Sequence, residues 1–154
     1  MKLKIVAPGK IKEKWLTAGI DEYRKRLSRY CSVEIIEVQD SPDTIPEDKA
    51  LSKEGDLILS KIRDGEVVWV MDLHGKLMSS EEISEALVSD MEKGGSSITV
   101  VIGGSNGLDP RVVSRAERRI CLGNITLTHQ MTRLILLEQI YRGFKIASGE
   151  KYHK

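Results

Sequence analysis

The sequence predicts an α/β fold whose mainly parallel sheet is covered by helices on both faces. Strand-like and helix-like segments alternate along the chain, which is typical of parallel sheets joined by helical crossovers. Residues 98–102 form an unbroken β-branched run, as expected of a strand buried on both faces. We find no internal repeat and no linker, so residues 1–154 are expected to form a single domain.

Three strands are expected in the first half of the chain, each ended by turn residues. The first alternates in polarity and ends at Pro8-Gly9, and the second precedes a cluster of Asp, Ser and Pro residues. The third is strongly apolar and ends at residues 72–76, which we interpret as a turn. The expected strands are residues 2–7, 32–39 and 66–71.

Two helices are expected between these strands. The first carries Trp15, Ile20 and Leu27 near helical spacing, with Lys and Arg residues between them. The second contains Gly55, which costs a helix about 1 kcal/mol relative to Ala, so we expect this helix to bend or fray. The expected helices are residues 10–29 and 47–62.

Helix start signals organise the second half of the chain. Ser79 and Glu82 form a capping box, which opens a helix that runs to residue 91. Asp109 and Pro110 supply an N-cap and a first-turn proline for a helix that ends near residue 118. The remaining elements are a strand at residues 98–102, a short strand at 120–122 and a long helix at 130–147.

The last helix carries four consecutive apolar residues, 134–137. Consecutive side chains point around the whole circumference of a helix, so this helix must be buried on more than one side. We therefore expect one side to contact a second subunit, which predicts a homodimer.

Two loops in the second half are the candidate ligand site. Gly103 and Gly104 open a glycine turn after one strand, and residues 123–129 form a polar loop after the next. Ligands of open α/β sheets bind at the carboxyl ends of strands, and glycines let the backbone approach a ligand closely. If the two strands are neighbours, both loops line one pocket. The alternative for the glycine turn is an ordinary tight connection.

Two common nucleotide-binding motifs are missing from this sequence. The glycine turn lacks the Gly-x-Gly-x-x-Gly spacing and follows the fourth strand rather than the first. No Gly-x-x-x-x-Gly-Lys-Ser/Thr loop occurs. Both observations disfavour nicotinamide-dependent enzymes and phosphate-loop nucleotidases.

Composition favours a cytoplasmic protein with two basic segments. The net charge is +1, but residues 10–29 hold seven basic and three acidic side chains, and residues 111–154 hold nine basic and three acidic ones. Two basic segments on one domain suit an RNA contact; a solvated face is the alternative. Cys31 and Cys121 stand alone and the histidines show no ligand spacing, so neither a disulfide framework nor a metal site is expected. We expect neither a signal peptide nor a membrane segment.

Taken together, these motifs resemble the bacterial family of 23S ribosomal RNA large-subunit pseudouridine methyltransferases H. The family belongs to the SPOUT class, whose members use S-adenosylmethionine and contain a C-terminal trefoil knot. The resemblance covers essentially the whole chain, and it implies methylation of N3 of a pseudouridine by a homodimer that acts on ribosomal RNA or the ribosome. It rests on Ile102-Gly103-Gly104 with Gly107-Leu108, on residues 125–129 (ITLTH), on residues 137–142 (LEQIYR) and on Tyr152-His153-Lys154.

The resemblance also implies two sets of site residues. Arg142, Tyr152 and His153 are the expected catalytic residues, because the base nitrogen must lose a proton before it accepts a methyl group. Thr128 stands where the family usually carries a proline. The expected cofactor-binding residues are Leu73, Gly103, Gly104, Leu122, Gly123, Asn124, Ile125, Thr126, Leu127 and Thr128.

Other interpretations of these residues and of the function stay open. His153 is alternatively part of a frayed terminus, and Arg142 is a cation that a helix C-terminus favours in any case. His129 is interpreted as a structural residue at a helix N-terminus. The alternative functions are a transfer-RNA methyltransferase of the same fold and a non-catalytic ribosome-binding module.

Overall fold

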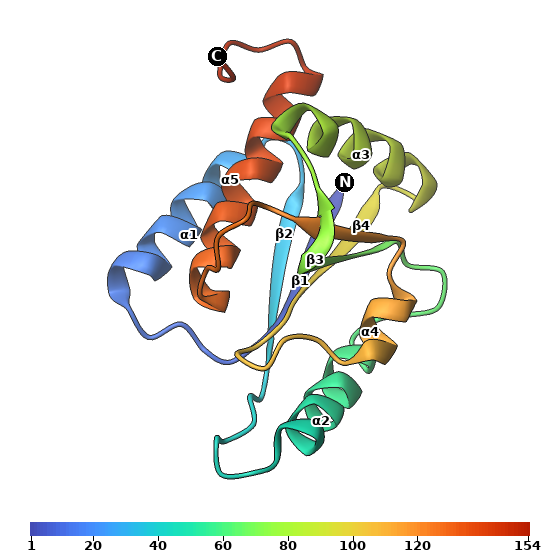
Figure 1. Ribbon diagram of the computed structural model, residues 1–154. Coiled ribbons are helices and arrows are strands. Elements are labelled where there is room, and N and C mark those ends of the chain that lie inside the picture. Colours follow the sequence, from blue (N-terminus) through green and yellow to red (C-terminus); the bar gives the residue numbers. More distant parts are fainter.

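The computed structural model describes all residues from 1 to 154 and contains one five-stranded sheet (Figure 1). All neighbouring strands are parallel, and their order is β2-β1-β4-β3-β5. The strands are β1 (Lys2–Pro8), β2 (Ser32–Val38), β3 (Val68–Leu77), β4 (Ser97–Ile102) and β5 (Arg118–Cys121). The helices are α1 (Lys14–Leu27), α2 (Glu47–Leu59), α3 (Ser80–Lys93), α4 (Pro110–Arg115) and α5 (His129–Ala147).

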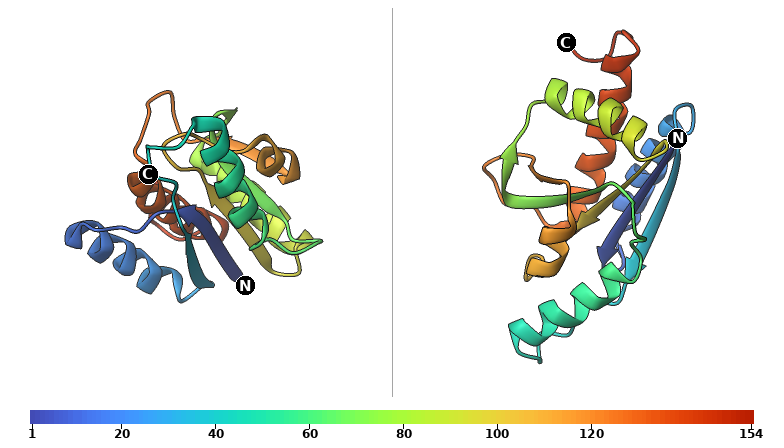
Figure 2. Two further views of the ribbon diagram at one scale, coloured as in Figure 1. Left: turned by 90° about the horizontal axis from the view of Figure 1, so that it is seen from below. Right: turned by 90° about the vertical axis from the view of Figure 1, so that its right-hand side faces the viewer.

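Helices cover both faces of the sheet, which confirms the predicted architecture. Side chains of a strand alternate between its two faces, and β1 accordingly sends Ile5 into one core and Val6 into the other. The larger core lies under α1, α3 and α5, and the smaller one lies under α2 and α4. Figures 1 and 2 show α5 packed beside both α1 and α3.

Helix α5 is attached to the sheet by a buried cation as well as by apolar side chains. Leu136 and Leu137 are buried, and the side chain of Arg133 is fully buried. The Arg133 guanidinium donates to the carbonyl oxygens of Pro8 and Gly9 at 2.7 and 2.9 Å, where β1 ends. These bonds fix the start of α5 against the carboxyl end of the sheet.

The expected turn at residues 72–76 is wrong, because these residues lie within β3. The ladder between β3 and β5 shifts register here, so that Met71 and Lys76 both lie opposite Ile120. Gly75 passes so close to β5 that a β-carbon on it would lie 2.6 Å from the Arg119 carbonyl carbon. Pairing with β5 therefore overrides the turn-like composition of this stretch.

Several expected helix ends are also wrong. Residues 10–13 precede α1, and α2 ends at Leu59 instead of residue 62. Helix α4 ends at Arg115, because the chain turns into the sheet, where the Glu117 N–H donates to the Val68 carbonyl oxygen at 2.9 Å. In addition, β4 and β5 are not neighbours, since β3 lies between them.

The glycine in α2 has a packing role that composition alone does not reveal. A β-carbon on Gly55 would lie 2.3 Å from the Oδ2 atom of Asp109, the buried N-cap residue of α4. The missing side chain thus lets α2 and the start of α4 approach each other closely. The helix is not broken there, although we expected it to bend or fray.

We therefore predict that Gly55→Ala destabilises the protein, even though Ala is the better helix former. The added methyl group must displace Asp109, and such overpacking typically costs about 1–3 kcal/mol. Gly19→Ala in α1 is the matched control, because a β-carbon there meets only a terminal methyl group of Leu134, at 3.3 Å. Urea denaturation measures both variants; equal or higher stability of Gly55→Ala contradicts the prediction.

Candidate functional site

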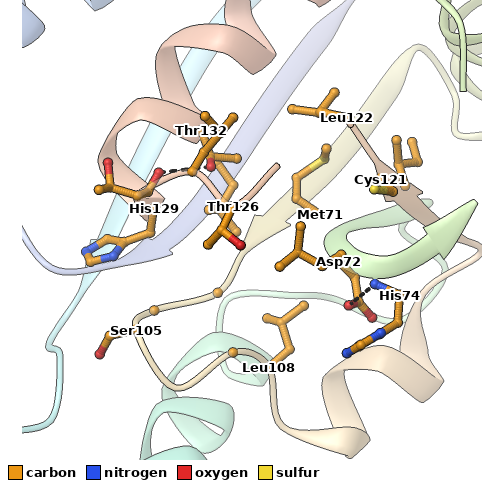
Figure 3. A pocket seen from close by; sticks show the side chains of 18 of the residues that line it. Met71, Asp72, His74, Ser105, Leu108, Cys121, Leu122, Thr126, His129 and Thr132 are labelled. Carbon is orange, nitrogen blue, oxygen red and sulfur yellow. Dashed lines mark hydrogen bonds between the residues drawn. The ribbon is translucent and has the colours of Figure 1, made fainter. Parts of the chain in front are cut away.

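A cavity of about 630 Å³ lies where β3, β4 and β5 end, and Figure 3 shows it from close by. Four segments line it: the outer part of β3, the glycine turn after β4, the loop after β5 and the first turn of α5. Volumes of this size are typical of small-molecule and cofactor sites. The lining residues are Met71, Asp72, Leu73, His74, Ile102, Gly103, Gly104, Ser105, Gly107, Leu108, Ile120, Cys121, Leu122, Gly123, Ile125, Thr126, Leu127, Thr128, His129, Gln130 and Thr132.

The glycine turn is compact because two of its residues cannot carry side chains. Gly107 has a positive φ of 86°, and its N–H donates to the Gly104 carbonyl oxygen at 3.1 Å. A β-carbon on Gly103 would lie 2.6 Å from the Gly107 carbonyl oxygen. The hydrogen bond between Gly107 and Gly104 closes this turn and holds its backbone at the edge of the cavity.

A buried carboxyl group lies behind this turn. A β-carbon on Gly104 would lie 2.8 Å from Oε1 of Glu54, whose residue is only 6% exposed. Burial raises the pKa of Glu54, and the nearby charge of Asp40 raises it further. A larger residue at position 104 must first push this side chain away.

The loop after β5 presents open backbone to the cavity. None of the N–H groups from Gly123 to Thr128 donates to a backbone carbonyl, so these donors are free to bind a ligand. The loop is fixed at both ends: the Cys121 thiol donates to the Gly123 carbonyl at 3.1 Å, and Thr128 caps α5 by accepting from the Met131 N–H at 3.2 Å.

The charged residues of the cavity lie on its rim. Asp72 accepts from the His74 N–H at 2.9 Å and from Arg119 at 2.6 Å. Burial opposes the charge of Asp72, but these two partners outweigh burial and lower its pKa. His129 lies on the opposite side of the cavity from Asp72 (Figure 3). Burial and the nearby charge of Arg133 lower the pKa of His129, and the charge of Asp40 opposes this shift. Met71, Leu108 and Leu122 give the centre an apolar lining.

The lowered pKa of His129 predicts a pH-dependent stability. In the unfolded chain this imidazole takes up its proton near pH 6.5, whereas in the folded protein it does so only at lower pH. The unfolded state then binds more protons, so the free energy of unfolding falls as pH decreases through this interval. His129→Gln should flatten this part of the profile between neutral pH and about pH 5, as measured by thermal unfolding. The exposed His74→Gln serves as the control; identical slopes for all three proteins contradict the prediction.

The structure brings nearly all of the predicted cofactor-binding residues together. Every one of them lines the cavity except Asn124, which is exposed outside the lining. Their binding role stays a prediction. His129, the last residue of the predicted polar loop, lines the cavity as well. The lining also includes Met71, Asp72, Gln130 and Thr132, which were not predicted. Their position follows from the register of β3 and the attachment of α5, and no local motif indicates it.

The expected catalytic residues lie elsewhere, on the outer end of α5. Arg142 donates to Glu138, and its guanidinium carbon lies 4.8 Å from the centre of the Tyr152 ring. The imidazole of His153 contacts both Arg142, at 3.3 Å, and Glu81, at 2.8 Å. The three residues therefore form one group, but none of them lines the cavity of the same chain.

The start of α5 lines the cavity, whereas the C-terminal group lies at the other end of the helix; Figure 1 shows the chain terminus at that end. His129 is in the cavity, and Arg142 follows thirteen residues later, which corresponds to about 20 Å along a helix. The fixed geometry of α5 means that one chain cannot bring the two sets of residues together.

No group of three or more His, Cys, Asp or Glu side chains is arranged to hold a metal ion. None of the helices combines the length and apolar character that crossing a bilayer requires.

The sequence is similar to methyltransferases along almost its whole length. Residues 1–153 match the family described as "Predicted SPOUT methyltransferase". Relatives named "Ribosomal RNA large subunit methyltransferase H" align over 100% of both chains, at 46% identity in Acetivibrio thermocellus and at 48% in Limosilactobacillus reuteri and Enterococcus faecalis.

A solved structure shares the fold of this chain. It is described as a probable methylase family protein from Haemophilus influenzae, and it aligns with a TM-score of 0.56 and 17% identity over 99% of this chain and 70% of that one. The fold, the loop-lined cavity and a family match that spans almost every residue lead to one conclusion: the chain belongs to the SPOUT methyltransferase family.

Proposed function

We propose that this chain is an S-adenosylmethionine-dependent methyltransferase that methylates N3 of a pseudouridine in 23S ribosomal RNA, with residues 1–154 acting as one cytoplasmic domain. One observation carries the proposal: a cavity of cofactor size occurs in a chain that is nearly half identical, from end to end, to relatives named ribosomal RNA large subunit methyltransferase H. The family assignment also implies a trefoil knot around α5.

The cavity residues fit this cofactor. An apolar centre at Met71, Leu108 and Leu122 suits a flat ring, and the free N–H groups of residues 123–128 suit the acceptor atoms of an adenine or ribose. The cofactor would be held by Leu73, by Gly103 and Gly104, and by the loop after β5. When bound, it supplies an activated methyl group on a sulfonium, so this chain must only align the acceptor and remove one proton.

The C-terminal group supplies residues suited to that proton transfer. The pKa of Tyr152 is raised to about 12, chiefly by burial and by Tyr23, so its phenol remains protonated and acts as a donor or a stacking surface. Hydrogen bonds to Glu138 raise the pKa of Arg142, which stays cationic and suits stabilisation of a base anion. His153 is then the residue of the three that is suited to accept the N3 proton.

We further propose that the active enzyme is a homodimer in which the C-terminal group of one subunit reaches the cavity of the other. The separation along α5 supports this arrangement, because the helix keeps Arg142 about 20 Å from the cavity residue His129 of the same chain. Exposed apolar side chains support a contact along α1 and α5: Trp15 is 62% exposed, and Leu134 and Ile135 are only partly covered.

The homodimer has a direct test. Light scattering at micromolar concentration should give twice the chain mass, and Ile135→Lys should give the chain mass, because a charge would be buried in the contact. The exposed Val88 on α3 provides the control Val88→Lys, which should remain dimeric. A wild-type monomer refutes the shared site.

The experiment that tests the function combines binding and product analysis. S-adenosylmethionine and S-adenosylhomocysteine should raise the unfolding temperature; a ligand at a hundredfold excess over its Kd stabilises a folded protein by about 2.7 kcal/mol. Mass analysis of ribosomal RNA from cells lacking the gene should reveal one pseudouridine without its methyl group. A missing methyl group in transfer RNA would instead identify the chain as a transfer-RNA methyltransferase. If both RNAs are unchanged and neither ligand raises the unfolding temperature, the chain is a non-catalytic ribosome-binding module.

A further inference from the structure

The carboxylate of Glu138 lies at the centre of the C-terminal group. Its Oε1 atom accepts from Arg142 Nη2 at 2.6 Å and Nε at 3.1 Å, and from the Tyr152 hydroxyl at 3.2 Å. The side chain is only 20% exposed. One carboxylate oxygen therefore joins two expected catalytic residues that are ten positions apart in the chain.

The second oxygen of Glu138 connects this group to α3. Oε2 accepts from the Gln139 side-chain amide at 2.7 Å, and the amide oxygen of Gln139 accepts from the Ser80 hydroxyl at 2.7 Å. Both oxygens are thus occupied, which fixes the rotation of the carboxylate. A carboxylate held in one orientation also holds its hydrogen-bond donors, Arg142 and Tyr152, in place.

These contacts exceed those of an ordinary helix ion pair. A Glu and an Arg four residues apart on a helix stabilise it only slightly, and such a pair needs no third partner. Here the Glu138 carboxylate also accepts from the Tyr152 hydroxyl. The centre of the Tyr152 ring lies 4.8 Å from the Arg142 guanidinium carbon and 5.0 Å from the centre of the Tyr141 ring. The arrangement orders the tail as well as the helix.

We propose that Glu138 is a positioning residue, which holds Arg142 and Tyr152 in the single arrangement that methyl transfer requires. Glu138 acts through these two residues and does not itself touch the target base. The inference rests on the proposed function, because it assigns a role within the same active site. Glu138 belongs neither to the predicted catalytic residues nor to the predicted cofactor-binding residues.

Glu138→Gln tests this inference with the size of the side chain preserved. Misplacement of a catalytic group by about 1 Å costs about 10²-fold in rate, so kcat on 23S ribosomal RNA should fall by about that factor. The KM for S-adenosylmethionine should not change, because Glu138 does not line the cofactor cavity and holds residues that act on the target base. Glu150→Gln is the matched control, because the Glu150 side chain also accepts from a tyrosine and a cation, Tyr30 and Lys145. Only its backbone carbonyl, which the substitution preserves, contacts the C-terminal group, by accepting from the Tyr152 N–H at 2.9 Å. The kcat of this variant should stay within about threefold of the wild type.

A double-mutant cycle separates positioning from general stability. If Glu138 acts through Arg142, adding Glu138→Gln to Arg142→Ala should lower kcat by no more than about threefold, since coupled residues are not additive. Full additivity of the two losses, or a wild-type kcat in Glu138→Gln, overturns the inference.

Tyrosine NMR gives a readout that needs neither RNA nor activity. Glu138 is one of the groups that raise the pKa of Tyr152, so ¹³C-labelled tyrosine should show Tyr152 titrating at lower pH in Glu138→Gln than in the wild type. An unchanged titration overturns the inference. If Glu138→Gln does not fold, Glu138→Asp takes its place in both measurements. A wild type that titrates as expected but methylates no ribosomal RNA instead refutes the proposed function.

Discussion

Deleting Tyr152, His153 and Lys154 is expected to lower the rate of methyl transfer about 10²–10⁴-fold, the usual loss when an acid–base or positioning group is removed. The affinity for S-adenosylmethionine should stay nearly unchanged, because none of these residues lines the cofactor cavity and their expected role is on the target base. Single-turnover methylation of 23S ribosomal RNA and isothermal titration with the cofactor measure the two effects separately.

The deletion also removes contacts that hold the end of α5, so stability must be controlled. Tyr152 packs against Tyr141, and His153 bridges Arg142 and Glu81. Deleting Lys154 alone leaves all of these contacts in place and should leave the rate unchanged. Full activity without residues 152–154, in a folded dimer, would show that the tail is a frayed terminus.

Gly123→Val is expected to weaken cofactor binding while leaving the fold intact. A β-carbon on Gly123 meets no atom within 4 Å, and the residue lines the cavity. The fold therefore tolerates the added side chain, whereas a bound cofactor collides with it. Overpacking of this kind costs about 1–3 kcal/mol, which corresponds to a roughly 5- to 150-fold higher Kd.

The control for Gly123→Val is Asn124→Ala, one residue further along the same loop. Asn124 belongs to the predicted cofactor set but lies outside the cavity lining, so its replacement should leave the Kd unchanged. Thermal unfolding without ligand should be the same for both variants. An unaltered Kd in Gly123→Val contradicts the assignment of this loop to the cofactor.

The two variants together test whether the active site is shared between subunits. At a limiting concentration of cofactor, tail-deleted chains and Gly123→Val chains are each expected to have strongly reduced activity. Mixed dimers contain one intact cavity and one intact tail, so mixing should restore part of the activity if the tail acts on the partner. No restoration, in mixtures shown to exchange subunits, means that each chain works alone.

Local patterns in the sequence predicted the elements whose ends carry local signals. The capping box at Ser79 and the N-cap at Asp109 are both present in the structure, because they depend on contacts within one helical turn. The β-branched run became the buried strand β4, since apolar side chains on both faces leave no other stable position.

The sequence predicted the two loops that line the cavity, but it did not predict the strand order that brings them together. Both loops line it, although the strands that precede them are separated by β3. Our reasoning required β4 and β5 to be neighbours; instead, the outer part of β3 bends between the loops and contributes Met71 and Asp72. A register shift of this kind depends on pairing with a strand some fifty residues away, which no local window contains.

The sequence by itself determined the fold class, the family and the two loops that line the cavity, because these depend on short-range patterns. Only the tertiary structure decided which residues share a site. It separated Arg142, Tyr152 and His153 from the cavity by the length of α5 and joined them through Glu138. The physical reason is that a helix fixes its own length locally, whereas the partners at its two ends are chosen by packing against distant parts of the chain.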